Sequence, residues 1–153
     1  MINQSPRLKL FFLTMFLFLI SVPAIAANNQ AKVLSVSGQA DFKKMGSANW
    51  ESLNVGKVLS EGDALRTSAG SEVVMNLEGA AKTAEIVVRE SSEFVFKTFQ
   101  HEMDATDTTL LDVSLGAVLV KAQKLVGNSK FEVKTPTSIV GIRGTTFEVS
   151  VAK

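Results

Sequence analysis

Few residues in this chain are suited to catalysis or metal binding. Its 153 residues include one histidine, His101, and no cysteine, which excludes disulfides, cysteine zinc sites and thiol nucleophiles. A Ser-His-Asp triad would need His101, but no G-x-S-x-G nucleophile elbow occurs. His101 could join Glu102, Asp104 and Asp107 around a metal, yet this stretch lacks the additional oxygens and the turn glycine of a calcium loop. Residues 141–146 (GIRGTT) lack the spacing and the lysine of a phosphate-binding loop.

These patterns favour a protein that is not an enzyme and that uses no cofactor and no metal ion. None of the 15 acidic residues forms a recognisable pair for glycoside hydrolysis. Trp50 is the only tryptophan and tyrosine is absent, which leaves little aromatic surface for carbohydrate. Trp50 is either a packing residue or a candidate partner contact, whereas Phe94, Phe96 and Phe99 are expected in the core.

Residues 1–26 have the layout of a targeting segment. Arg7 and Lys9 precede an apolar stretch at 10–22, and Pro23 and Ala-Ile-Ala follow. This order predicts a signal peptide cleaved between Ala26 and Ala27. The alternative is an uncleaved anchor, but 13 helical residues span only about 20 Å of a bilayer core of about 30 Å. We expect residues 27–153 to form one domain that is secreted across the inner membrane, into the periplasm of a Gram-negative cell, without stable membrane insertion.

The charge of that domain bears on its partners. Without Arg7 and Lys9, 14 basic side chains face 15 acidic ones, so its net charge is −1. Proteins that bind nucleic acid neutralise phosphates with an excess of basic residues. We therefore expect no nucleic-acid partner.

Period-two alternation of apolar and polar residues predicts an all-β domain. Segments with this pattern or a strongly apolar variant of it lie at 72–77, 85–89, 93–97, 111–115, 117–121, 131–134 and 147–151. The segments 85–89 and 117–121 are apolar on both faces, which predicts central strands. We expect about ten short strands in an antiparallel β-sandwich or jelly roll, a polar loop at 100–109, and one helical turn at 121–126.

Three stretches together resemble the FecR periplasmic domain family. They are Val58–Thr67 with Ser71–Leu77, Leu115–Val120, and Phe131–Pro136 with Val140–Val149. The resemblance covers residues 33–151 and implies an extracytoplasmic, non-enzymatic sandwich of jelly-roll type. In the best-known members this domain contacts a receptor as part of a membrane regulator of a sigma factor. Only nine residues precede the apolar stretch here, so a cytoplasmic anti-sigma region is not expected.

The motif residues have structural explanations of their own. Gly62 and Asp63 suit a turn, because glycine accepts positive φ and the carboxylate accepts backbone N–H groups. Thr135 and Pro136 suit the end of a strand. The full set of motif positions, which we interpret as structural, is Gly62, Asp63, Thr67, Gly116, Thr135, Pro136, Gly144, Thr145 and Phe147.

The leading hypothesis is a binding module for an unidentified envelope protein or receptor. The last strand, 145–151, offers a docking surface if it lies at a sheet edge, because an edge has unpaired backbone groups. Arg143, between Gly141 and Gly144, is the first candidate contact residue. The alternatives are a membrane-tethered sensor and a carbohydrate-binding envelope protein.

Overall fold

The computed structural model describes residues 30–78, 84–101, 106–125, 127–142, 144 and 146–152. These residues form twelve β-strands. The strands are β1 (Gln30–Ser37), β2 (Ala40–Lys43), β3 (Glu51–Ser52), β4 (Val58–Leu59), β5 (Ala64–Thr67), β6 (Glu72–Glu78), β7 (Ala84–Val88), β8 (Glu93–His101), β9 (Asp107–Ala122), β10 (Lys130–Lys134), β11 (Ile139–Ile142) and β12 (Thr146–Val151). Within this part of the chain, no helix is long and apolar enough to span a bilayer.

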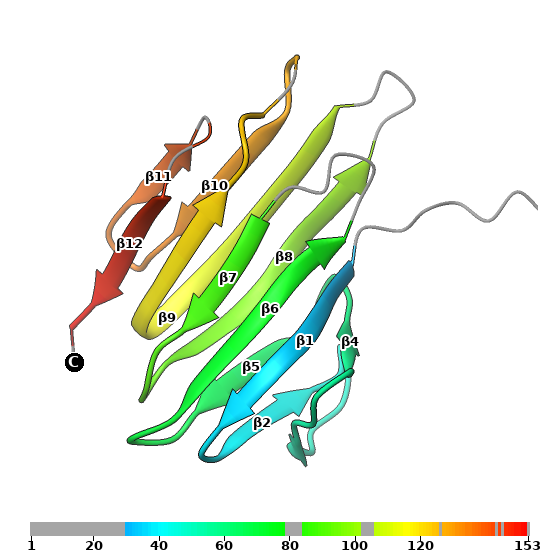
Figure 1. Ribbon diagram of the computed structural model, residues 1–153, viewed down its shortest axis with the longest axis vertical. Helices are drawn as coiled ribbons and strands as arrows, with labels where there is room; N and C mark the ends of the chain where they lie inside the picture. The colour runs from blue at the N-terminus through cyan, green and yellow to red at the C-terminus, as the bar shows by residue number, and fades with distance from the viewer. Residues whose placement is uncertain are drawn as a thin grey trace, which may run out of the picture.

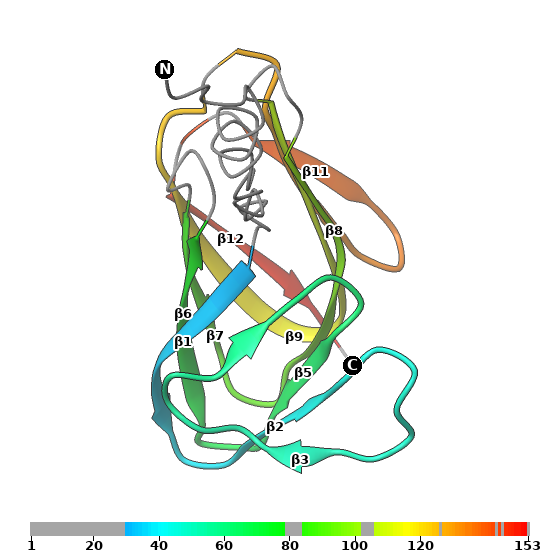
Figure 2. The same ribbon diagram turned by 90° about the vertical axis from the view of Figure 1, so that its right-hand side faces the viewer.

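The strands lie in two facing layers, which confirms the prediction of an all-β sandwich (Figures 1 and 2). Layer A has the order β12-β9-β7-β6-β1-β4, and layer B has the order β11-β10-β9-β8-β5-β2-β3. Strand β9 belongs to both layers. Its first half pairs with β8 and its second half pairs with β7 and β12.

All but one of the strand pairs are antiparallel. The exception among the described strands is β10, which runs parallel to the first half of β9, with Phe131 opposite Thr109. Because β9 ends in layer A, the chain must return to layer B before β10 begins. Strand β10 therefore begins at the same end of the sandwich at which β9 begins, and the two strands run in the same direction.

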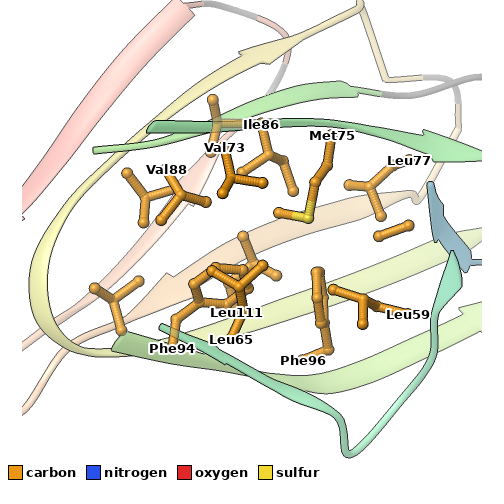
Figure 3. Close-up of a cluster of buried hydrophobic side chains, with 14 of the residues drawn as sticks. Leu59, Leu65, Val73, Met75, Leu77, Ile86, Val88, Phe94, Phe96 and Leu111 are labelled. Carbon is orange, nitrogen blue, oxygen red and sulfur yellow. The ribbon is translucent and has the colours of Figure 1, made fainter. Parts of the chain in front are cut away.

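The core fills the space between the layers (Figure 3). Alternate residues of each strand point inward, as the period-two pattern predicts. Met75 and Ile86 of layer A face Phe94, Phe96 and Leu111 of layer B, and all five are fully buried. The rings of Phe94 and Phe96 meet edge to face with centroids 4.9 Å apart, a favourable aromatic arrangement. Their predicted place in the core is confirmed, whereas the Phe99 side chain lies outside the described part of the chain.

Most strand predictions are confirmed, including the central positions of 85–89 and 117–121. The former lies in β7 between β6 and β9, and the latter lies in β9 between β7 and β12. The segments 111–115 and 117–121 are, however, parts of one long strand.

Two other expectations are wrong. The loop predicted at 100–109 is shorter, because β8 continues to His101, which pairs with Asp107 at the start of β9. Polar residues can pair there because a ladder uses backbone groups. The helical turn predicted at 121–126 is absent from its described part, since Lys121 and Ala122 complete β9 and pair with β7.

Candidate functional site

The two layers are joined at the point where β9 bends. Gly116 lies at the bend with φ +82°, a backbone conformation that glycine adopts without strain. A Cβ atom on Gly116 would lie 2.2 Å from Ser92 Oγ and 2.5 Å from Ser92 Cα. The bend therefore requires glycine for its conformation and for its close approach to the chain before β8.

Buried hydroxyl groups hold this bend in place. The Thr67 hydroxyl donates to the Arg89 carbonyl (2.6 Å) and accepts from the Ser92 N–H (3.0 Å). Ser92 Oγ accepts from the Ala117 N–H (3.0 Å). This Thr67–Ser92 network connects β5 of layer B to the ends of β7 and β9 in layer A. Two of the motif positions, Thr67 and Gly116, thus meet at one end of the sandwich.

A polar groove of about 580 Å³ opens above this network. Its lining is Gly70, Ser71, Glu72, Arg89, Glu90, Gly116, Ala117, Glu148 and Ser150. The Arg89 guanidinium lies 2.5 Å from a Glu72 carboxylate oxygen and 4.0 Å from one of Glu148. Glu90 accepts a hydrogen bond from the Gly70 N–H at 2.6 Å. With three carboxylates and one guanidinium, the groove has a net negative charge.

Strand β12 forms one side of this groove. It pairs with β9 from Thr146–Lys121 to Val151–Gly116, and within the described residues no strand pairs with its other side. Its position at the edge of layer A meets the condition on which the docking hypothesis rests. Phe147, a motif position, points inward and packs against the core, with Val149 and Val151 on the same face.

The sandwich has two open sides, and the edge strands on these sides differ in length. On the opposite side the edge strands are β3 and β4, two residues each, which cover only parts of β2 and β1, and β8 extends past β5 at residues 97–101 without a described neighbour on that side. On the near side they are β11, with four residues, and β12, with six. Proteins protect exposed edges with short strands, charged side chains, proline or bulges, and of these β12 (TFEVSV) has only the charge of Glu148. It is the longest unpaired edge in the described structure.

Comparison with protein-family models identifies the family to which this chain belongs. The family model described as FecR protein matches residues 63–153. The chain belongs to the FecR family. This membership supports a domain related to cell-envelope signalling. No curated protein and no solved structure matches the chain.

The FecR match begins inside the sandwich rather than at its boundary. Strands β1–β4 precede Asp63, yet β1 pairs with β6 along its whole length, from Gln30–Glu78 to Ser37–Glu72. Within the FecR match, Asp63 is 1% exposed and joins its own turn to the segment at 44–45. Its carboxylate accepts from the Met45 N–H (3.0 Å), the Ser60 N–H (3.0 Å) and Lys44 Nζ (2.7 Å). Gly62 precedes it with φ +84°.

Thr135 closes the turn from β10 to β11. Its hydroxyl accepts from the Ser138 N–H at 3.0 Å, and its own N–H donates to the Ser138 carbonyl at 2.8 Å. Pro136 is exposed in that turn. A Cβ atom on Gly144 would lie 2.6 Å from Lys124 Cα, so the chain before β12 passes close to the chain after β9.

Trp50 lies before β3 on the outer face of layer B. The Arg66 guanidinium is 4.3 Å and Lys43 Nζ is 4.8 Å from its ring centroid, and Arg66 also binds Asp41 at 2.8 Å. Two cationic side chains of the protein itself, Lys43 and Arg66, therefore already contact the Trp50 ring.

Several predicted site residues lie outside the described residues, namely Ala26, Ala27, Glu102, Asp104, Arg143 and Thr145. The same holds for the side chains of His101 and Asp107. In the described part of the chain, no group of three or more potential metal ligands comes together. Sequence reasoning missed Ser92, Arg89 and Glu148 as one site. They are single polar residues up to 59 positions apart, and only strand pairing brings them together.

Proposed function

We propose that this FecR-family protein is a non-enzymatic binding module of the cell envelope, secreted out of the cytoplasm, that recognises an extended segment of a partner protein. The partner segment adds to β12 as the next strand of layer A. Backbone hydrogen bonds then supply affinity, and side chains on the two faces supply specificity.

The observation that carries this proposal is the length of β12, whose six residues pair with a described strand on one side only. The two-residue edges of β3 and β4 offer an incoming strand few backbone groups, and the open stretch of β8 at 97–101 is shorter than β12. The six residues of β12 offer a full strand length. The Thr67–Ser92 network and the core hold β9, and therefore β12, in a fixed position. A preorganised edge loses little conformational entropy when it binds.

Photo-cross-linking in the host cell tests this function. A photo-reactive residue is placed at Thr146 or at Ser150 of the full-length chain, both exposed on the outer face of β12, and at Glu51 on β3 as the control. If a strand adds to β12, the adducts from positions 146 and 150 should map four residues apart in one segment of one envelope protein. This spacing follows because two paired strands have the same rise per residue. No adduct at β12, or adducts scattered over several proteins, would overturn the proposal.

A further inference from the structure

The two faces of β12 set different requirements for the strand that pairs with it. Phe147, Val149 and Val151 face the core, and Thr146, Glu148 and Ser150 face outward. Residues opposite each other on paired strands share a face. An added strand therefore needs apolar side chains opposite Phe147 and Val149 and tolerates a polar side chain opposite Glu148.

Glu148 is the only charged residue of β12, and its charge is weakly compensated. Its side chain is 48% exposed, and the Arg89 guanidinium lies 4.0 Å away. That guanidinium is closer to Glu72, at 2.5 Å. Glu90 adds a further carboxylate to the groove beside β12. A cation arriving opposite Glu148 would reduce this excess negative charge, whereas an anion would increase it.

We propose that the segment recognised by β12 is an extended strand with the alternation apolar–basic–apolar, in which a lysine or arginine lies opposite Glu148. This inference rests on the proposed function and specifies the chemistry of its partner. A second copy of this chain fits less well. Strand β12 contains no basic residue, so pairing with its own copy leaves Glu148 without a cation opposite it.

The size of the expected preference for lysine over glutamate follows from the energies of charge pairs across two strands. Opposite charges directly across two strands contribute up to about 1 kcal/mol, and like charges destabilise by a similar amount. Exchanging lysine for glutamate in the partner strand loses the attraction and adds the repulsion, so binding should change by up to about thirtyfold at low salt.

The absence of cysteine from the chain permits a test by disulfide trapping. The full-length Ser150→Cys variant has a single thiol on the outer face of β12. The probes are Ac-Thr-Cys-Val-Lys-Val-Thr-NH2 and its reversed sequence, which cover antiparallel and parallel addition. Matched peptides contain glutamate in place of lysine, or proline in place of the valine between cysteine and lysine. The measurement is the fraction of mixed disulfide at equilibrium in a thiol buffer, with Ser52→Cys on β3 as the control protein.

The expected result is more mixed disulfide with the lysine peptide than with the glutamate peptide, by a factor of about two to thirty. The preference should reverse in the Ser150→Cys/Glu148→Lys variant. The proline peptide should fall to the Ser52→Cys level, because it keeps the charge but cannot pair as a strand. Equal capture of the lysine and glutamate peptides above that level overturns the charge preference and leaves the proposed function intact. Capture of every peptide at the Ser52→Cys level overturns strand addition itself.

Discussion

Replacing Gly116 with alanine is expected to destabilise the sandwich severely, because β9 bends between the layers at this residue. Alanine at φ +82° costs about 1–2 kcal/mol in backbone conformation alone. The added Cβ would also lie 2.2 Å from Ser92 Oγ, 2.5 Å from Ser92 Cα and 2.7 Å from the Ser91 carbonyl oxygen. Two of these three atoms belong to the backbone, so a side-chain rotation cannot relieve the overlap.

The overlap adds to the conformational cost. Overpacking costs about 1–3 kcal/mol, and displacing Ser92 weakens the hydrogen bond to the Ala117 N–H, at a cost of about 1 kcal/mol. Together these effects lower the free energy of unfolding by about 3–6 kcal/mol, a large part of the 5–15 kcal/mol typical of a domain.

Gly56→Ala is the matched control. Gly56 has φ +84° and no atom within 4 Å of an added Cβ, so it should show the conformational cost of about 1–2 kcal/mol and nothing more. Urea unfolding followed by far-ultraviolet circular dichroism measures both variants against the parent chain. Unfolding free energies for Gly116→Ala and Gly56→Ala that agree within about 1 kcal/mol would refute the steric argument.

Three further predictions concern other parts of the chain. In urea unfolding, Asp63→Asn should cost about 1–3 kcal/mol, because the buried carboxylate accepts three hydrogen bonds, and a loss no larger than that of the exposed variant Glu51→Gln would contradict it. Ser92→Ala should cost about 1–3 kcal/mol by leaving the Ala117 N–H unpaired, against less than about 0.5 kcal/mol for the exposed Ser114→Ala, and a similar loss for both would exclude the Thr67–Ser92 network as a stabilising feature. Mass spectrometry of the protein from its host should find a species about 2.8 kDa lighter than the full-length chain, through cleavage after Ala26, and an intact chain of 16.4 kDa in the membrane fraction would favour the anchor instead.

Much of the fold follows from local pattern, because each half-buried strand alternates in its own sequence. Phe94 and Phe96 of β8, and Val73 and Met75 of β6, are in the core for this reason. The change of layer at Gly116 does not follow from local pattern. The apolar segments on its two sides look like separate strands, and only their pairing with β8 and with β7 shows that one strand serves both layers.

The candidate site was predictable only in part. The sequence raised the edge hypothesis for the last strand, but whether a strand is central or peripheral depends on which strands pair with its neighbours. The groove could not be predicted from the sequence either, because strand pairing between distant segments forms it. Glu72, Arg89, Ala117 and Ser150 lie side by side because β6, β7, β9 and β12 are consecutive in layer A.

Sharing β9 between the layers has a consequence for the order of folding. Strands β7 and β8 both pair with β9, so during synthesis from the N-terminus each has an open edge until residues 107–122 have emerged. A chain that ends before β9 would expose one edge in each layer, and exposed edges of folding intermediates promote aggregation. The first eight strands are therefore not an independent folding unit, and a truncation between β8 and β9 should yield an aggregating fragment rather than a smaller domain.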